Sequence, residues 1–170
     1  MQRMQRAWKW LFASGIAACL LAIAAWPVAP PQAMATDLVI TAANVAWVSG
    51  PAPQLVVVAE TVTAGQVLYL DSSVNQYRKA QSNVAGKQVP TALALSAGAA
   101  NGYVIIAVAG TTVNSGATVV KNTSYFLSGA NAGGIAPQAD ITAGWNTVIV
   151  GIAPNTTNLL LTFYASGITN

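Results

Sequence analysis

Three carboxylates, Glu60, Asp71 and Asp140, are the side chains in this sequence that are most suited to acid-base chemistry. A pair of carboxylates about 5 to 10 Å apart can act as acid and base in glycoside hydrolysis. Asp71, however, directly follows an apolar run, where aspartate commonly caps a turn, and Asp140 lies in a polar stretch. Because no motif couples the three, we predict no catalytic residue and no enzymatic activity.

Thiol and imidazole chemistry is missing from most of the chain. The sequence contains no histidine, and its single cysteine, Cys19, lies in an N-terminal apolar run. Disulfide frameworks, Cys/His metal sites, cysteine nucleophiles and Ser-His triads are therefore excluded for residues 36–170. We predict no metal site and no cofactor-binding residue.

Two tryptophans and two asparagines have alternative interpretations. Trp47 and Trp145 are candidates for a sugar-stacking platform, although a tryptophan beside a turn more often packs as a lid. The tripeptides that begin at Asn122 and Asn155 match the N-glycosylation pattern. We interpret both asparagines as turn residues.

A glycine pair and a basic pair stand out among the polar segments. Gly133-Gly134 is expected to supply positive-φ turn geometry. No helix with a lysine follows it, so it is not a phosphate-binding P-loop. Arg78-Lys79 lies in a short segment, residues 77–80, that we expect to be an edge strand, where adjacent charges discourage edge-to-edge pairing.

Charge is scarce and unevenly placed. The chain is 54% hydrophobic and only 6% charged, against roughly 25% charged in an average domain. Arg3, Arg6 and Lys9 precede the first apolar run, whereas residues 36–170 hold four basic and four acidic residues. No basic footprint for nucleic acid exists in that region. Such a near-neutral surface suits a protein packed into an assembly, the alternative being an ordinary β-domain with a Ser/Thr/Asn surface.

Residues 1–35 are signal-peptide-like. A basic start precedes the uncharged run 10–26, and Ala33-Met34-Ala35 has a small-x-small cleavage pattern. Residues 16–19 resemble a lipoprotein cleavage box, but further apolar residues follow Cys19. The run is at the short limit of a membrane span, roughly 17 to 25 residues, so membrane association is expected only if this segment is retained. In the alternative interpretation translation begins at Met34 and residues 1–33 are an over-extended start.

Residues 36–170 are predicted to form a single all-β domain. Turn signals recur every 8 to 12 residues or so without a helical period. We expect a compact β-sandwich or small β-barrel of about nine to eleven short strands, preceded by one N-terminal apolar helix. Strands are predicted at 38–41, 54–62 and 117–121, with 54–62 buried on both faces, a turn at 110–116, and at most one helical turn, within 81–87.

About 135 residues suffice for a real hydrophobic core without a disulfide. The apolar residues predicted to supply much of it are Val56, Val58, Leu68, Leu70, Leu93, Leu95, Ile105, Phe126, Ile149, Ile152, Leu160 and Phe163.

The two halves of this domain look like related strand-turn-strand units. Residues 67–71 match residues 124–128, and residues 92–96 match residues 149–153. Both matches fall at one offset of about 57 residues, which favours a common origin over two coincidences.

The motifs in these halves carry a family resemblance. Residues 63–71, 77–80 and 92–97 resemble the first half, and residues 125–128, 133–137, 139–140 and 150–153 the second half, of small head-decoration (head cement) proteins of tailed bacteriophages. The resemblance covers roughly residues 36–168 and rests on spaced common residues. It implies a β-rich domain on the outside of an assembled capsid that reinforces the shell, often as trimers bound to the major capsid protein. It brings no catalytic residue, and residues 1–35 depart from it.

We therefore expect a non-enzymatic structural virion protein that binds and stabilises the head and assembles in the host cytoplasm. The alternative is an exported bacterial or phage-encoded surface β-domain, secreted or periplasmic through residues 1–35, that binds a protein or glycan. The sequence leaves open the translation start, the oligomeric state, the partner-facing surface, the strand order and the host.

Overall fold

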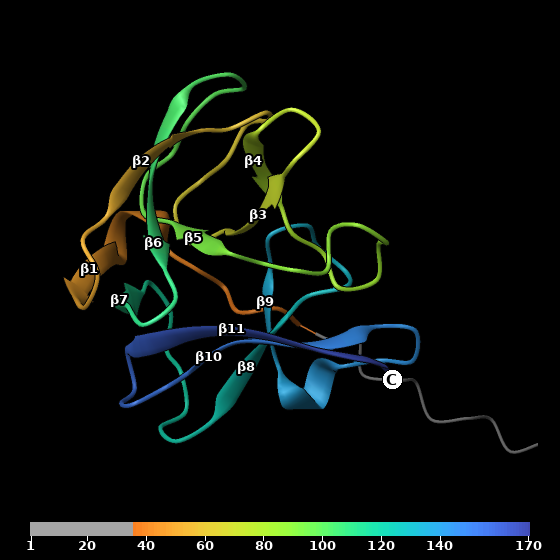
Figure 1. Cartoon of the computed structure of the whole chain (residues 1–170). Helices are drawn as coiled ribbons and strands as arrows, with labels where there is room; N and C mark the ends of the chain where they lie inside the picture. The colour runs from red at the N-terminus through yellow and green to blue at the C-terminus, as the bar shows by residue number, and fades with distance from the viewer. Residues whose placement is uncertain (1–35) are drawn as a thin grey trace, which may run out of the picture. The chain divides into compact units, whose positions relative to one another are not determined.

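A computed structural model describes residues 36–170. Its regular structure there comprises eleven strands and two single turns of 3-10 helix, η1 (Ala42–Asn44) and η2 (Gln138–Asp140) (Figure 1). The all-β prediction is confirmed. The expected N-terminal apolar helix falls in residues 1–35, outside the described residues.

The larger of two antiparallel sheets has six strands and contains the longest hairpin, β10–β11. Its order is β1-β7-β11-β10-β8-β9. The strands are β1 (Val45–Ser49), β7 (Thr112–Ser115), β8 (Ser124–Leu127), β9 (Ile135–Pro137), β10 (Asn146–Ile152) and β11 (Asn158–Thr169). Phe163 adopts a left-handed φ of 44° where β11 bulges against β10, between the pairs Gly151–Leu161 and Ile149–Tyr164.

The smaller sheet has five strands in the order β2-β6-β5-β3-β4 and curls back on itself. The strands are β2 (Gln54–Val57), β3 (Val67–Asp71), β4 (Gln76–Lys79), β5 (Ala92–Ala94) and β6 (Tyr103–Val108). Just beyond β2, Val58 forms a parallel bridge with Tyr77 of β4, and the Ala59 N–H donates to the Tyr77 carbonyl at 2.9 Å. The two end strands of the sheet therefore meet.

The two sheets share a five-strand order. The small sheet runs β2-β6-β5-β3-β4, and from β7 onward the large sheet runs β7-β11-β10-β8-β9. Each strand in the second series lies about 57 residues after its counterpart in the first. The relatedness of the halves, inferred from residue likeness, stays a prediction, and the common strand order is a separate observation.

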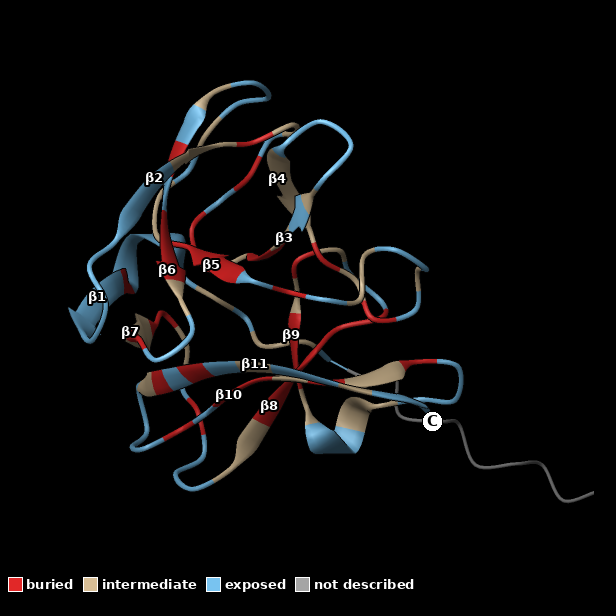
Figure 2. Ribbon diagram, viewed as in Figure 1, coloured by how far each residue is buried: buried red, intermediate tan, exposed pale blue. Residues whose placement is uncertain are grey.

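Two apolar cores hold the domain together. The inter-sheet core takes residues from both sheets, among them Val67 and Leu93 of the small sheet and Leu127 and Leu159 of the large sheet. The small-sheet core lies within the curl of the small sheet and comprises Val58, Val62, Leu68, Ala92, Ala94, Val104 and Ile106. Because side chains alternate along a strand, β3 and β5 feed both cores, and β5 is buried throughout (Figure 2).

The predicted core is confirmed in part. Val58, Leu68, Leu93 and Phe126 are buried. Val56, Leu95 and Phe163 are partly buried against the cores, and Ile149 is half-buried. The prediction is wrong for four exposed residues: Leu70, Ile105, Ile152 and Leu160.

Strand alternation explains most of these errors. Ile105 lies between the fully buried Val104 and Ile106, and Leu160 lies between the buried Leu159 and Leu161. Selecting the wrong member of such a run moves the prediction to the opposite face of the sheet. Ile152 is the cross-strand partner of Leu160 and faces outward with it, and Leu70 lies near the turn of the β3–β4 hairpin.

Several predicted boundaries are also wrong. The predicted turn 110–116 contains β7, and neither 117–121 nor 38–41 forms a strand. Gly110 and Gly116, both at positive φ, are the turns on either side of β7, and pairing with β1 and β11 defines the strand between them. The predicted strand 54–62 ends at Val57 and is not buried on both faces, because Leu55 is exposed. No helix forms within 81–87.

Candidate functional site

The carboxylates of the small sheet make structural ion pairs. Asp71 Oδ2 lies 3.0 Å from Arg78 Nε, and Asp71 Oδ1 accepts hydrogen bonds from the Ser73 N–H (3.0 Å) and Ser73 hydroxyl (2.6 Å). Glu60 Oε2 lies 3.6 Å from Lys79 Nζ, and Glu60 Oε1 accepts the Lys79 N–H at 2.7 Å. Asp71 therefore caps the β3–β4 turn, as its position after an apolar run indicates.

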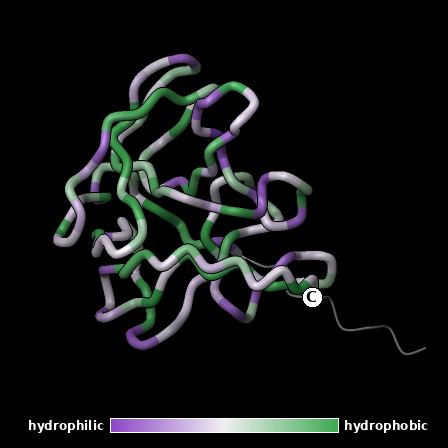
Figure 3. The backbone as a smooth tube through the Cα atoms, in the orientation of Figure 1, coloured by the Kyte–Doolittle hydropathy of each residue, from purple (hydrophilic) through white to green (hydrophobic). Residues whose placement is uncertain are grey.

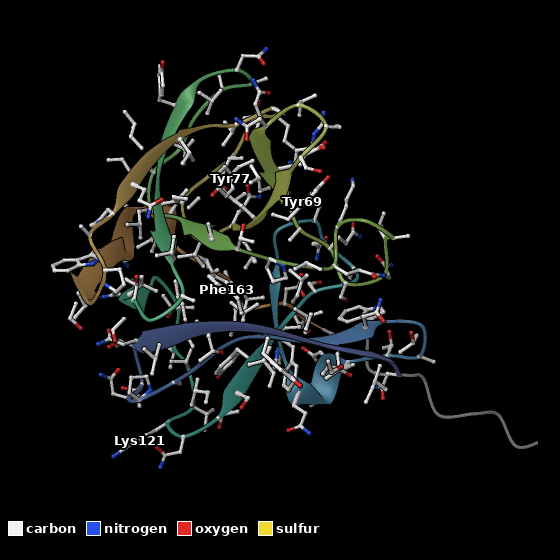
Figure 4. The ribbon with its side chains drawn as sticks, in the orientation of Figure 1. Tyr69, Tyr77, Lys121 and Phe163 are labelled. Atoms are coloured by element: carbon white, nitrogen blue, oxygen red, sulfur yellow. The ribbon has the colours of Figure 1, made fainter. Side chains whose placement is uncertain are left out.

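These contacts determine the ionisation of Asp71. Hydrogen bonds from Ser73 hold the pKa of Asp71 below its ordinary value of 3.8, and the neighbouring Arg78 lowers it further. Burial raises the pKa of Tyr69 above its ordinary value of 10.0, and Asp71 adds to that effect. Asp71 is thus ionised at neutral pH and cannot serve there as a general acid. Figure 4 shows Tyr69 and Tyr77 on the neighbouring strands β3 and β4.

Asp140 is not part of this group. It ends η2, which follows β9 of the large sheet, whereas Glu60 and Asp71 belong to the small-sheet region (Figure 1). Neither Asp140 nor Lys121 belongs to an ion pair among residues 36–170, and Lys121 lies in the loop before β8, far from Tyr69 and Tyr77 in Figure 4. Within the same residues no three potential ligands cluster in a way that could hold a metal ion.

The glycine pair joins the two sheets. Gly133 has a φ of 79°, as predicted, and its N–H donates to the Ala80 carbonyl at 2.7 Å while its carbonyl accepts the Val67 N–H at 2.9 Å. The positive-φ prediction is wrong for Gly134, but a Cβ there would overlap Asp37 Oδ2 and lie 3.0 Å from Ser128 Cβ. The Gly134 N–H donates to the Asn131 carbonyl at 3.0 Å. Both amides are used within the fold.

The tryptophans do not form a common platform. Trp145 is only 6% exposed and packs so closely on Gly129 that a Cβ there would lie 2.4 Å from the indole ring. The lid interpretation is therefore confirmed for Trp145. Trp47 is 43% exposed, and its indole N–H donates to the Pro51 carbonyl at 3.0 Å.

Both sequon asparagines occupy turns, as interpreted. Asn122 adopts a left-handed φ of 61°. Asn155 Oδ1 accepts the backbone N–H groups of Thr157 (2.9 Å) and Asn158 (2.8 Å). These geometries account for the two asparagines without any modification.

An exposed apolar patch on β2 and β6 is the main surface feature that sequence reasoning missed. Leu55 (66% exposed) pairs across the strands with Ile105 (42%), and the half-buried Val57 pairs with Tyr103 (68%). We call these four residues the β2–β6 patch. Figure 3 shows both strands as largely hydrophobic, and Figure 2 shows β2 as exposed over its first half and intermediate over its second. The signal for β2 in the sequence is the apolar run within residues 54–62, which resembles a strand buried on both faces.

Two open depressions also lie on the surface of the described residues. One, of about 490 Å³, is lined mainly by neutral polar residues: Val39, Thr41, Asn44, Asn114, Gly116, Ala117, Thr118 and Thr157. The other, of about 270 Å³, lies beside the glycine pair and includes Asp37 and Gln66. The first contains hydrogen-bonding groups and no ionisable side chain.

Comparison with known proteins leaves the site to be judged from its own geometry. No protein-family model matches the chain, and no curated protein shows significant sequence similarity to it. Within residues 36–170 we find no helix with the length and hydrophobicity needed to cross a membrane.

Proposed function

We propose that this chain is a non-enzymatic structural virion protein, like the phage head-decoration proteins that its motifs resemble, and that it binds and stabilises an assembled head. The β2–β6 patch is the observation that carries the proposal. Monomeric soluble domains seldom leave neighbouring large apolar side chains on adjacent strands exposed unless they contact a partner. The proposed partner is the major capsid protein.

The chemistry of the patch supports a permanent contact. No charged residue occurs in β2 or β6. Burying apolar surface contributes roughly 25 cal/mol per Å², and no ion pair has to be desolvated at this surface. A stable interface of roughly 1,200 to 2,000 Å² would extend beyond the patch to the surrounding Ser, Thr and Asn side chains.

The non-enzymatic part of the proposal is supported by the roles of the carboxylates. Asp71 and Glu60 are committed to ion pairs and to backbone N–H groups of the β3–β4 region. The proposed architecture is a compact β-sandwich whose small sheet approaches a barrel, supported by the Val58–Tyr77 bridge. The proposed assembly is a homo-oligomer, with the trimer that the resemblance implies, in virions assembled in the host cytoplasm and without a nucleic-acid or cofactor partner.

A second candidate function has one observation in its favour. The 490 Å³ depression presents the side chains of Asn44 and Thr118, groups suited to hydroxyl-rich ligands, beside Asn114 and Thr157, whose side chains also hydrogen-bond within the fold. An exported surface domain, secreted or periplasmic through residues 1–35, would bind a glycan or protein there. Retention of residues 1–35 would also allow membrane association.

Binding to heads separates these functions. Heads assembled without the chain are mixed with the purified full-length protein, and bound protein is measured by co-sedimentation. We expect Tyr103→Ala in the β2–β6 patch to weaken binding by about tenfold or more, because aromatic anchors dominate interfaces. Tyr164→Ala is the matched control, since Tyr164 is similarly exposed on β11. Absence of wild-type binding, or equal losses in both variants, would overturn the proposed function.

The N-terminal mass of the natural protein tests its location independently. A chain that begins at Met34 or Ala35 within virions supports the decoration role. A chain that begins at Thr36 and occurs only outside the cytoplasm would replace that role with the exported one.

A further inference from the structure

Asn101 and Gly102 form the single Asn-Gly sequence of this chain. They lie in the turn that leads into β6, where the Gly102 N–H donates to the Ala99 carbonyl at 2.9 Å. Asn101 is exposed and adopts a left-handed φ of 62°, as the third residue of a type II turn does. Asparagine tolerates this conformation better than most residues.

An asparagine that precedes glycine can convert into an acid without an enzyme. The glycine nitrogen attacks the side-chain carbonyl carbon and closes a succinimide ring. The bond to the side-chain nitrogen breaks, and ammonia leaves with the proton that the glycine nitrogen gives up. Water then opens the ring to aspartate or to isoaspartate, so neither a metal nor an oxidant takes part. Glycine favours ring closure because it has no Cβ to crowd its nitrogen.

The Asn101 side chain is available for this reaction. Within residues 36–170 its amide has no hydrogen-bond partner, whereas Asn155 in another turn accepts two backbone N–H groups with its Oδ1. Asn83 is also exposed, but it precedes the β-branched Val84, whose side chain crowds the attacking nitrogen. Asn101 therefore combines a free amide with the least crowded neighbour.

The closed turn opposes ring closure. At the third residue of such a turn ψ is about 0°, which directs the glycine nitrogen away from the asparagine side chain. The Asn101 N–H donates to the Val58 carbonyl at 2.7 Å, and the Gly102 carbonyl accepts the Val58 N–H at 3.0 Å. These bonds and the Gly102–Ala99 bond hold the backbone in this conformation. Local opening of the turn must therefore precede the reaction.

We propose that Asn101 is a self-modification site, which deamidates slowly while the turn is closed and rapidly once the turn opens. The site adjoins the β2–β6 patch, because Asn101 and Gly102 bond to Val58, the residue that follows β2, and Gly102 precedes Tyr103. Deamidation adds a negative charge next to two strands that contain none. Isoaspartate also adds a carbon to the backbone at the contact with Val58.

The consequence for binding rests on the proposed function. A carboxylate held against an apolar contact without a partner is costly to bury. Deamidation of Asn101 should therefore weaken attachment to the head. The modification itself goes beyond the proposed function, because it requires only this chain and water.

Peptide mapping by mass spectrometry tests the modification. Full-length protein is incubated in mildly alkaline buffer, folded or in guanidinium chloride, and the acid form of each asparagine is followed over time. In denaturant Asn101 should convert about tenfold or more faster than Asn83, the matched exposed asparagine. In the folded protein Asn101 should convert about tenfold or more slowly than in denaturant. Equal rates at the two asparagines, or equal rates with and without denaturant, would overturn the inference.

Head binding provides the second readout. Wild-type protein in which Asn101 has converted is compared with fresh protein and with Asn101→Gly, which suits the positive φ and has no amide to lose. Converted wild type should bind about threefold or more weakly, because of its added charge. Asn101→Gly should bind equally before and after the same incubation. Unchanged binding of the converted protein would overturn the effect on the patch. If fresh wild type also fails to bind, the proposed function fails, while peptide mapping still decides the modification.

Discussion

The small and large sheets have the same strand order but differ in whether their end strands meet. In the small sheet the end strands meet through Val58 and Tyr77, and the curl encloses a core of its own. The corresponding strands of the large sheet do not close. Instead β1 extends one edge, and the large sheet buries its inner face against the small sheet in the inter-sheet core (Figure 4 shows Phe163 between them). One topology therefore gives a self-contained sheet and a sheet that depends on its neighbour.

The charged residues follow this division. Both ion pairs among residues 36–170 lie in the small-sheet region, Asp71–Arg78 and Glu60–Lys79. At the same offset the large sheet has Ser128 in place of Asp71 and Ile135 in place of Arg78. Ser128 Oγ accepts the N–H groups of Ala130 and Asn131 at 3.1 Å each, as Asp71 accepts that of Ser73. Both turns therefore have a capping oxygen at this position, which is charged in the small sheet and neutral in the large sheet.

Core truncations in the two sheets test their mutual dependence with the largest expected effects. Leu68→Ala empties part of the small-sheet core, and Leu127→Ala empties part of the inter-sheet core. Each should lower the free energy of unfolding by about 2–5 kcal/mol, because both side chains are fully buried. Since Val67 and Leu93 of the small sheet belong to the inter-sheet core, urea unfolding followed by circular dichroism should remain a single transition. Two separate transitions would show that the sheets fold independently.

A glycine at the bulge of β10 should be the next most sensitive position. A Cβ on Gly151 would lie 2.5 Å from the Leu160 carbonyl oxygen, which is backbone of the paired strand and cannot rotate away. Gly151→Ala should cost about 1–3 kcal/mol of unfolding free energy, measured by urea denaturation. The control is Gly144→Ser in a loop, where no atom lies within 4 Å of the added Cβ, although its φ of 88° makes a small cost expected there too. Equal losses in both variants would contradict a steric origin at the bulge.

The capping oxygens should contribute less. Ser128→Ala removes the acceptor of two N–H groups, but Ala130 and Asn131 are exposed and their amides can turn to water. A loss of about 0.5–1.5 kcal/mol is expected. Thermal unfolding of Ser128→Ala beside the wild type measures it. Ser128→Asp should lose more stability than Ser128→Ala, because the site is fully buried and the added carboxylate would have no cation partner there. A Ser128→Asp variant as stable as the wild type would show that the large-sheet turn tolerates the charge that Asp71 carries in the small sheet.

Sequence reasoning was most successful where the signal was local. The all-β class, the turn roles of Asn122, Gly133 and Asn155, and the cap at Asp71 depend on residue types within a few positions of each other. The face of each strand depends on pairing instead. The runs around Ile105 and Leu160 are apolar at successive positions, so only the paired strands determine which member is buried. For the same reason the β2–β6 patch was hidden in a run that resembles a buried strand.

The smallest expected effect depends on pH. The pKa of Asp71 is lowered in the folded protein, whereas in the unfolded chain it has its ordinary value of 3.8. The folded state therefore binds the proton less readily, so Asp71 contributes stability that is present above the ordinary pKa and is lost as the pH falls through the lowered value.

Asp71→Asn keeps an acceptor for Ser73 but loses the charge beside Arg78. Urea denaturation between about pH 7 and pH 2 should show the wild type as the more stable protein near neutrality and the two curves converging in acid. Ser128→Ala, which removes an uncharged cap, should differ from the wild type by a constant amount over the same range. A gap between wild type and Asp71→Asn that stays equally constant would mean that the carboxylate acts only as a hydrogen-bond acceptor, as the serine does.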